Sequence, residues 1–431
     1  MTRAIVIGGG PAGLAAAVAL ASEGASVTVL EADRELGGRA RHWEGDGYRI
    51  NLGPHALYPQ AERLLNGLGV KVTGRTPSQD LTFELDGRTH PIPSGPLSLL
   101  SSGAFSLAEK MRLARLFASI GKPPTASLAT QTVAEWLDGL GLTGGARRFA
   151  EAGVRIATYA NAPERLSAAV AVRQLGSAQV RYVDGGWGGI VDALARRAEG
   201  LGVTIRTRAK VRSVEPGAVH LEGTVQLEGA VQLEGEALAC DAVVLAVGPK
   251  RAVSLLGAHA PASLRAFAEE AAPVRASHLD VALRALPRAR PSLVLGADRP
   301  LYASVHSSYA EVAPEGGAVI HLGRYLAPDE RVDPAAARRE LEALLEQIQP
   351  GWRGHLVHAR FAPASLVMHA LPEARSGGVA GRPASLVTPG VAVAGDWVGD
   401  TGLLLEASLA SALAAAHAVM PLSVSEPRAA V

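Results

Sequence analysis

The stretch that decides the fold is residues 5–13, IVIGGGPAG, in which a β-branched apolar run meets three glycines and leads into an alanine-rich segment. This order predicts a strand, a tight turn and a helix. Gly8 permits the turn, Gly10 lets the backbone approach a pyrophosphate, and Gly13 lets the helix pack closely on the strand. The helix opens near Ala12, where it presents free backbone N–H groups and its positive dipole end. The stretch therefore predicts a dinucleotide-binding site.

The residues that follow indicate that the dinucleotide is FAD. A second apolar run, residues 27–30, predicts a strand ending at Glu31, whose carboxylate can accept hydrogen bonds from the hydroxyls of an unphosphorylated adenosine ribose. Gly37 and Gly38 then predict a turn, and Arg39 adds a guanidinium that suits phosphate. Strand, glycine turn, helix, strand and acid thus stand in the order that this kind of site requires.

Composition and charge narrow the class of protein. The 42 basic and 41 acidic residues give a net charge of +1, so no overall field attracts nucleic acid, and no such partner is expected. Cys240 is the only cysteine, which excludes an intramolecular disulfide and suits a reducing cytoplasm. Five histidines are scattered in predicted strands or loops without metal-ligand spacing, so most are expected to be structural and no metal site is expected: His278, His306, His321, His358 and His369. Residues 403–422 are apolar, but Glu406 and His417 interrupt them and favour a buried helix over a membrane span.

The length of 431 residues, 48% of them hydrophobic, accommodates two substantial domains. The predicted fold class is α/β, with a Rossmann-type FAD-binding domain that combines a parallel sheet and a three-stranded β-meander. A discontinuous α+β substrate-binding domain completes the chain. The FAD-binding domain is predicted over residues 1–58, 181–250 and 385–431, and the substrate-binding domain over residues 59–180 and 251–384.

Periodicity predicts the elements within these domains. Residues 203–214 predict one strand, and residues 59–180 are mostly helical in pattern. Three near-identical hexapeptides, residues 218–235, alternate apolar and polar positions with glycine between them, which predicts a surface β-meander that arose by sequence duplication. Residues 274–325 carry strand-like segments, and residues 328–349 predict a helix that caps the substrate domain.

With these blocks placed, the chain resembles the flavin amine oxidase and phytoene desaturase superfamily over nearly its whole length. The resemblance rests on the order of residues 8–13, Glu31, residues 37–39, residues 51–55, Gly185 and Gly186, Val211, and residues 393–397. It implies that Val211 holds the adenine through its backbone and that Asp396 hydrogen-bonds the ribityl chain. It implies also that Gly53 lies along the isoalloxazine. The helix over residues 402–418 then points its N-terminus, near Leu405, at the flavin C2 carbonyl, where backbone donors stabilise developing negative charge.

The chain departs from the amine oxidases of this superfamily at the catalytic positions. Those enzymes hold a lysine, bridged by water to flavin N5, in later strands of the substrate domain, and no lysine follows Lys250 here. Leu404 stands where a tyrosine often precedes the matching helix. Trp397 is a candidate for one wall over the flavin, with core packing as the alternative. His55 is a candidate general base with a pKa near neutrality, with a structural role as the alternative. Cys240 lies away from the usual attachment positions, so the FAD is expected to be noncovalent.

These implications favour an FAD-dependent oxidoreductase that removes hydride from a C–H bond of a largely apolar small molecule and forms C=C or C=N. The missing lysine favours a desaturase-like reaction over a flavin amine oxidase. Two further hypotheses stay open, an FAD-dependent isomerase without net oxidation and a noncatalytic lipid or prenyl escort on the same scaffold. The sequence does not determine the substrate, the oligomeric state or the electron acceptor, for which oxygen, a quinone and a carrier are the candidates.

Residues 93–122 interleave apolar and cationic side chains. They are Leu97, Leu99, Leu100, Phe105, Leu113, Leu116 and Phe117, with Lys110, Arg112, Arg115 and Lys122. In desaturase and protoporphyrinogen-oxidase relatives, a helical segment in this region can contact membrane near the substrate entrance, and an interfacial helix needs this mixture of faces. An ordinary helix of the substrate domain is the alternative. The expected location is therefore the cytoplasm, with peripheral membrane contact through residues 93–122 as a hypothesis.

Overall fold

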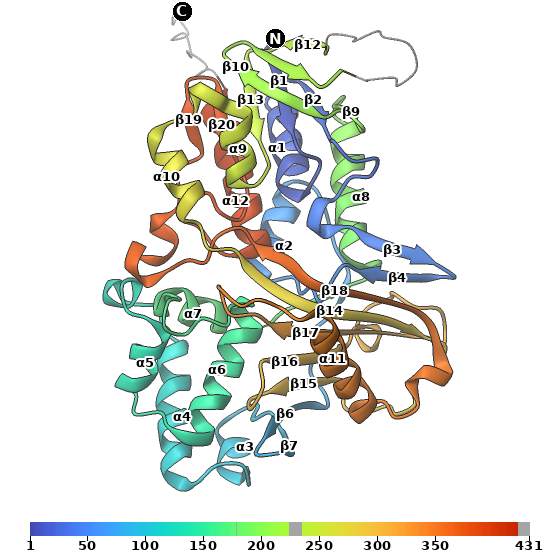
Figure 1. Ribbon diagram of the computed structural model, residues 1–431, viewed down its shortest axis with the longest axis vertical. Coiled ribbons are helices and arrows are strands. Elements are labelled where there is room, and N and C mark those ends of the chain that lie inside the picture. The colour runs from blue at the N-terminus through green and yellow to red at the C-terminus, as the bar shows by residue number, and fades with distance from the viewer. Residues whose placement is uncertain (178, 224–234, 421–431) are drawn as a thin grey trace, which may run out of the picture.

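The computed structural model describes residues 1–177, 179–223 and 235–420. Figure 1 shows two halves, each built on a sheet, with the N-terminal strand and α1 in the upper half and α11 in the lower. The upper sheet has six strands in the order β19-β20-β13-β1-β2-β9, all parallel except the β19–β20 pair. These strands are β1 (Arg3–Ile7), β2 (Ser26–Leu30), β9 (Thr204–Arg206), β13 (Ala242–Leu245), β19 (Leu386–Thr388) and β20 (Val391–Val393). The Rossmann-type prediction is confirmed.

Both faces of this sheet are buried, which is why its strands are nearly continuous apolar runs. Along β1, Ala4 and Val6 face one layer of helices, whereas Ile5 and Ile7 face the opposite layer. The first layer holds α1 (Pro11–Ser22), α8 (Gly186–Glu199) and α12 (Leu404–Val419), with α2 (Pro59–Gly67) packed on α12. The second layer holds the meander with α9 (Pro249–Leu256) and α10 (Ala262–Glu270).

The meander is present, but its strands are not the three hexapeptides. They are β10 (Val211–Glu215), β11 (Ala218–Leu221) and β12 (Ala237–Ala239), paired antiparallel. The first hexapeptide supplies β11, whereas most of the other two, residues 224–234, lies outside the described residues. The single strand predicted over residues 203–214 is wrong. The chain turns at Arg208, whose φ is 55°, and β9 and β10 join different sheets.

The lower sheet has seven strands in the order β18-β14-β17-β16-β15-β6-β7, antiparallel except for β15 with β6. They are β6 (Leu81–Leu85), β7 (Arg88–Pro91), β14 (Val274–Leu283), β15 (Leu293–Gly296), β16 (Leu301–Val305), β17 (Ala318–Tyr325) and β18 (Leu356–Met368). The predicted capping helix is α11 (Pro334–Ile348), and Asp333 caps it by accepting from two backbone N–H groups at 2.9 and 3.1 Å. The strands β6 and β7 interrupt the region expected to be helical.

Helices from residues 96–175 pack around the β6 and β15 end of this sheet. They are α3 (Pro96–Ser101), α4 (Leu107–Ile120), α5 (Val133–Gly139), α6 (Gly144–Thr158) and α7 (Ala168–Leu175). Two small antiparallel pairs, β3 (His42–Gly45) with β4 (Tyr48–Asn51) and β5 (Gly74–Arg75) with β8 (Tyr182–Val183), complete the fold. Each large sheet collects segments that are far apart in sequence, while the domain boundaries themselves stay a prediction. Among the described helices, none is long and apolar enough to cross a membrane.

Candidate functional site

A cleft of about 610 Å³ is lined by both halves of the molecule. At one end it meets the β1–α1 turn, Glu31 and Val211, and at the other it meets Gly53, His55 and residues of β14 and β18. The helices α1 and α12 begin beyond the carboxyl ends of β1 and β20, so their N-termini face the same cleft, where parallel sheets of this type bind ligands. Every site residue predicted from the sequence lines the cleft except Gly13.

The three motif glycines differ in what surrounds them. Gly8 has a φ of 110°, and a Cβ there would lie 2.5 Å from the Ala246 carbonyl oxygen. A Cβ on Gly13 would lie 1.9 Å from the Gly8 oxygen, which explains why Gly13 supports the turn from behind and does not line the cleft. A Cβ on Gly10 meets no described atom closer than 3.8 Å. Packing within the protein therefore does not require glycine at residue 10, whereas close approach of a ligand from the cleft does.

Glu31 is held in place by the backbone around the turn. One carboxylate oxygen accepts from the Gly9 N–H at 2.7 Å, and the other accepts from the Asp33 N–H at 2.8 Å. Nearby, Arg251 donates to the Val211 carbonyl oxygen at 2.6 Å and fixes the end of β10 against α9. The adenosine end of the expected site is thus formed by a fixed carboxylate and a fixed backbone edge.

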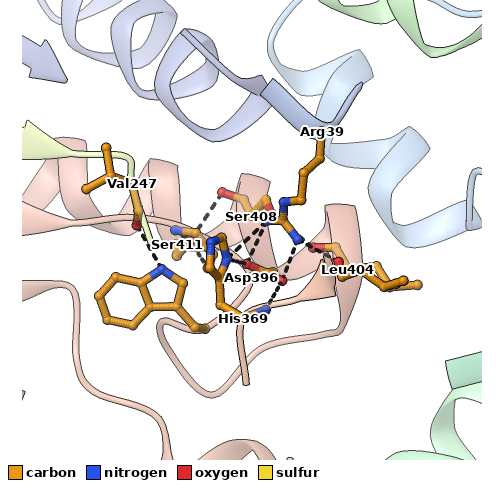
Figure 2. A network of polar contacts seen from close by, with 10 residues as sticks. Arg39, Val247, His369, Asp396, Leu404, Ser408 and Ser411 are labelled. Carbon is orange, nitrogen blue, oxygen red and sulfur yellow. Dashed lines mark hydrogen bonds and ion pairs between the residues drawn. The ribbon is translucent and has the colours of Figure 1, made fainter. Parts of the chain in front are cut away.

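Asp396, just beyond β20, is the centre of a polar network that Figure 2 shows. Its side chain is 2% exposed. Arg39 donates to both carboxylate oxygens, at 2.9 and 3.0 Å, and a further N–H of Arg39 donates to the Val367 carbonyl oxygen at 2.5 Å. His369 adds its backbone N–H at 3.1 Å and its ring Nδ1 at 2.7 Å. Asp396 therefore joins the Gly37–Arg39 turn to the end of β18.

The charge on Asp396 is secured by these partners. Burial on its own raises the pKa of Asp396, but Arg39 and His369 outweigh it and hold that pKa well below its ordinary range. From the sequence, Arg39 and Asp396 were assigned to the cofactor separately, and their pairing was not predicted. His369 was expected to be structural, although it lines the cleft. The feature that could have indicated a site role for His369 is its position directly after β18, at the edge where the other site residues lie.

The N-terminus of α12 faces the cleft, as the resemblance implied. Leu404, Leu405 and Ser408 line the cleft, and the N-cap residue Leu403 gives no side-chain cap to the helix within the described part of the chain. Leu404 has a φ of 55°, which is unfavourable for a branched non-glycine residue. Strained backbone at an uncapped helix start is typical of a binding position, because the first-turn N–H groups remain available to a ligand.

His55 lies at the cleft, but one premise about it was wrong. Its Nδ1 is 2.8 Å from the Gly53 carbonyl oxygen, an acceptor, so this nitrogen carries the hydrogen, and the ring packs on Trp187 with centroids 4.6 Å apart. Burial lowers the pKa of His55 to about 4, against the near-neutral value expected. His55 is thus a neutral ring at pH 7 and a weak base.

Trp397 does not form a wall of the substrate space. Its side chain is 0% exposed, its indole N–H donates to the Val247 carbonyl oxygen at 3.0 Å, and its ring stacks with Phe267 at 5.8 Å. Although Trp397 belongs to the lining of the cleft, its side chain has no accessible surface with which to contact a substrate. The catalytic assignment of Trp397 is therefore corrected to packing of the core beneath the upper sheet.

A second polar cluster, around Asp280 in β14, was not predicted. Asp280 is fully buried and lies 2.7 Å from the Nδ1 atoms of both His278 and His321. It also accepts from the Gly53 N–H at 3.2 Å. His278 and His321 were expected to be scattered structural residues, because their positions in two different strands hide their proximity. Among the described residues, no group of three or more potential metal ligands occurs.

The family model for flavin containing amine oxidoreductases matches residues 11–420. The chain therefore belongs to this family, and its cofactor is a flavin. The β1–α1 turn, Glu31 and the α12 N-terminus fit a flavin dinucleotide, since they offer an open glycine approach, a carboxylate for ribose hydroxyls and free backbone donors.

Individual relatives resemble parts of the chain or its fold. An L-amino-acid oxidase of Pseudechis australis is 46% identical over 65 residues, 15% of this chain and 12% of that protein. A carotenoid 3,4-desaturase of Haloarcula japonica is 53% identical over 49 residues, 11% of this chain and 10% of that protein. The matches thus span only a small part of these relatives. An oxidoreductase from Methanosarcina mazei, with 18% identity and a TM-score of 0.73 over 95% of this chain and 99% of that one, shares the fold.

Proposed function

We propose that the protein is an oxidoreductase with noncovalent FAD that removes hydride from a C–H bond of a largely apolar small molecule and forms C=C or C=N. The observation that carries this proposal is that one continuous cleft connects the glycine turn and Glu31 to residues of the lower sheet. A cofactor held at the first end reaches toward a substrate held at the second.

The chain's own residues divide the work along the cleft. The α1 N-terminus binds the pyrophosphate, Glu31 the ribose, and the network of Arg39 and Asp396 positions the ribityl side. When bound, FAD supplies the hydride acceptor. The first-turn N–H groups of α12 stabilise negative charge at the edge they face. Cys240 is buried beneath the meander, away from the cleft lining, which supports noncovalent binding.

The substrate end favours a molecule that is apolar over most of its surface. Pro54, Ala56, Leu366 and Leu404 line this end, and Tyr159 donates to the Pro54 carbonyl oxygen at 3.1 Å. Among the described residues that line the cleft, Lys210 is the only lysine, and it lies at the adenosine end. The substrate end therefore has no lysine among these lining residues. That supports the desaturase-like reaction, with amine oxidation as the second candidate.

An anaerobic reduction assay tests this function. The purified protein is expected to be yellow and to release FAD on acid denaturation. Mixed without oxygen with benzylamine or with phytoene in detergent, it should lose its flavin absorbance with the substrate that it oxidises. Bleaching by phytoene supports C=C formation, and bleaching by benzylamine supports C=N formation. Oxygen, a quinone and a carrier protein can then be compared as reoxidants of the reduced flavin.

The same assay distinguishes an isomerase and an escort protein from the oxidoreductase. Conversion of phytoene to an isomer without bleaching would establish an isomerase and overturn net oxidation. A colourless protein that binds neither added FAD nor riboflavin would support a lipid or prenyl escort. Flavin that stays attached after acid precipitation would contradict the noncovalent part of the proposal.

We also infer that the end of the molecule formed by α3 and α4 contacts a membrane surface. Leu97, Leu100, Leu107 and Met111 are 84%, 59%, 69% and 56% exposed. Of the apolar residues noted from the sequence, Leu99, Phe105, Leu113 and Leu116 are instead buried in the domain core. Exposed apolar side chains beside Lys110 and Arg115 suit an anionic interface.

Vesicle sedimentation tests the membrane contact. The protein should sediment with vesicles of phosphatidylglycerol and phosphatidylcholine, and Leu97→Ser with Leu107→Ser should reduce the bound fraction. The matched control is Leu386→Ser, at a side chain that is 49% exposed but lies in β19 of the upper sheet. Equal sedimentation of wild type and double variant would contradict the inference and leave an ordinary helical end.

A further inference from the structure

A chain of hydrogen bonds leads from the cleft into the lower sheet. Ser365 of β18 lines the cleft, and its Oγ lies 2.7 Å from His278 Nε2. His278 Nδ1 lies 2.7 Å from one oxygen of Asp280, and His321 Nδ1 lies 2.7 Å from the other. His278 also lines the cleft, but His278 and Asp280 are only 2% and 0% exposed, so little of the chain is accessible to water.

The direction of each hydrogen bond follows from the chemistry of Asp280. Burial raises the pKa of Asp280, but His278 and His321 outweigh it and hold that pKa below its ordinary range, so Asp280 is a carboxylate and can only accept. Both Nδ1 atoms therefore carry a hydrogen. In the neutral ring of His278, Nε2 is then bare and must accept from the Ser365 hydroxyl. The lone pairs of Ser365 Oγ remain available to a group in the cleft.

An irregularity in β18 brings Ser365 to this position. Opposite β14, Ala276 pairs with Ser365 but His278 pairs with Ala362, so β18 advances three residues while β14 advances two. This is a β-bulge, a feature that often redirects side chains next to active sites. In a regular strand Arg360 and Ser365 would point to opposite faces, yet both line the cleft. The Ser277 hydroxyl donates to the Pro363 carbonyl oxygen at 2.6 Å and holds the bulge.

The charged and titratable groups that face His278 come from β14, β17, β18 and the segment around Gly53. Asp280 is the direct partner, from β14 itself, and His321 approaches the same carboxylate from β17. Arg360 of β18 places one guanidinium nitrogen 3.8 Å from Asp280, and His55 lies beside Gly53, which donates to Asp280. Behind them His306 packs edge-on against His321 at 4.3 Å. The adjacent carboxylate is the group positioned to balance a positive charge on His278, whereas Arg360 opposes it from a greater distance.

We propose that Ser365 is a catalytic residue that takes a proton from the substrate in the cleft, and that His278, positioned by Asp280, stores that proton. In this step the substrate N–H, O–H or activated C–H gives its proton to Ser365 Oγ, while the Ser365 hydroxyl proton passes to His278 Nε2. Ser365 ends neutral, His278 ends as an imidazolium, and the substrate has lost one proton and keeps the bonding electron pair. This inference rests on the proposed function, in which removal of hydride from the substrate leaves one proton to be taken up.

A nuclear magnetic resonance measurement tests the relay without any substrate. In ¹⁵N-histidine-labelled holoenzyme, with the signals assigned by His278→Gln, neutral His278 should show a protonated Nδ1 and a bare Nε2. Lowering the pH should add the proton at Nε2. Ser365→Ala should shift the Nε2 resonance and leave the tautomer unchanged, because Asp280 fixes it. A neutral His278 with its hydrogen on Nε2 would overturn the proposal, since Ser365 would then be an acceptor.

A kinetic measurement tests the role in the reaction, with benzylamine as the probe. Ser365→Ala should slow anaerobic flavin reduction by about 10²- to 10⁴-fold and flatten its pH dependence, with flavin content unchanged. Ser365→Thr keeps a hydroxyl and should restore most of the rate. Ser292→Ala is the matched control, because Ser292 is a buried serine before β15 whose hydroxyl donates to Gln79. If Ser365→Ala is reduced as fast as the wild type, the relay is overturned. If benzylamine does not reduce the wild type, amine oxidation is contradicted, and the resonance measurement then decides whether the relay exists.

Discussion

The two ends of the cleft are built in opposite ways. The nucleotide end uses backbone N–H groups and one carboxylate that lie within a single β-α-β unit, and Gly9 and Glu31 are only 22 residues apart. The substrate end uses side chains from β14, β17 and β18, and the contacts of Asp280 with Gly53 and of His278 with Ser365 span 227 and 87 residues. We call the nucleotide end, residues 8–13 with Glu31, the cradle, and it can be predicted from a sequence motif. We call the cluster of Ser365, His278, Asp280 and His321 the wall, and it depends on how distant strands align. We therefore expect changes in the cradle to affect cofactor binding, and changes in the wall to affect stability and the proposed reaction.

The largest effect is expected at the cradle. Gly10→Val should abolish FAD binding while the apoprotein stays folded, because Gly10 lines the cleft and a Cβ there meets no described atom closer than 3.8 Å. Flavin content and the thermal unfolding midpoint measure the two effects. Gly67→Val, at a glycine of α2 that is equally open, should keep its FAD. Gly13→Val should instead unfold the protein, since its Cβ would overlap the Gly8 oxygen. If Gly10→Val also unfolds the protein, the proposed difference between Gly10 and Gly13 is wrong.

The next effect concerns stability at the wall. Asp280→Ala should lower the free energy of unfolding by about 3 to 5 kcal/mol, the cost of removing one partner from a buried charged network. Two histidines and the Gly53 N–H lose their acceptor together. Urea unfolding measures the change, with Asp329→Ala as the control at a carboxylate that is 95% exposed and expected to cost little. A loss as small as that of the control would show that Asp280 is not the centre of the wall.

Asp396 lies between the two ends, and its removal should affect both cofactor and fold. Asp396→Ala should weaken FAD binding about ten- to hundred-fold, which corresponds to one charge-assisted hydrogen bond of roughly 1.5 to 3 kcal/mol. Isothermal titration of apoprotein with FAD gives the affinity, and Asp400→Ala, at an exposed carboxylate nearby, is the control. Unchanged affinity with a large loss of stability would assign Asp396 to the Arg39 and His369 network alone.

The pH dependence of stability should show two stages. His306 is buried and His55 is half-buried, and the pKa values of both are lowered from 6.5, so the unfolded chain binds their protons first and stability falls as the pH drops from 6.5 toward 4. The carboxyl groups of Asp280 and Asp396 have pKa values lowered from 3.8, so their contribution is present above 3.8 and is lost below it. Each group contributes a slope of at most about 1.4 kcal/mol per pH unit. Urea midpoints across this range measure it, and constant stability between pH 6.5 and 4.5 would contradict the first stage.

The smallest effect is expected at His55. Because burial lowers the pKa of His55 to about 4, His55→Ala should reduce kcat less than about ten-fold and leave flavin content intact. Steady-state kinetics with the substrate found by the reduction assay measure it beside Ser365→Ala. A drop of a hundred-fold or more in flavin-replete His55→Ala would return the role of general base to His55.

Sequence reasoning succeeded where function depends on neighbours along the chain. The turn at Gly8 to Gly13 and the acid Glu31 were predicted, because each follows directly from a strand whose apolar pattern is visible. The helix predicted over residues 402–418 is α12, Leu404–Val419. Sequence reasoning left the role of Trp397 open between a wall over the flavin and core packing, since the same residue type at the same position can face a ligand or the core. It failed for the strand over residues 203–214, because a single left-handed residue, Arg208, ended the strand inside a continuous pattern.

By itself, the sequence determined the dinucleotide fold and the flavin family, and it predicted the residues of the cradle, since these rest on glycine stereochemistry and local hydrogen bonds. The tertiary structure alone decided that Ser365, His278, Asp280 and His321 form one connected cluster. Strand register and one β-bulge place them together, and both are set by packing of the whole lower sheet. It also decided the charge states of Asp280 and Asp396, because burial and partner charges exist only once the chain has folded.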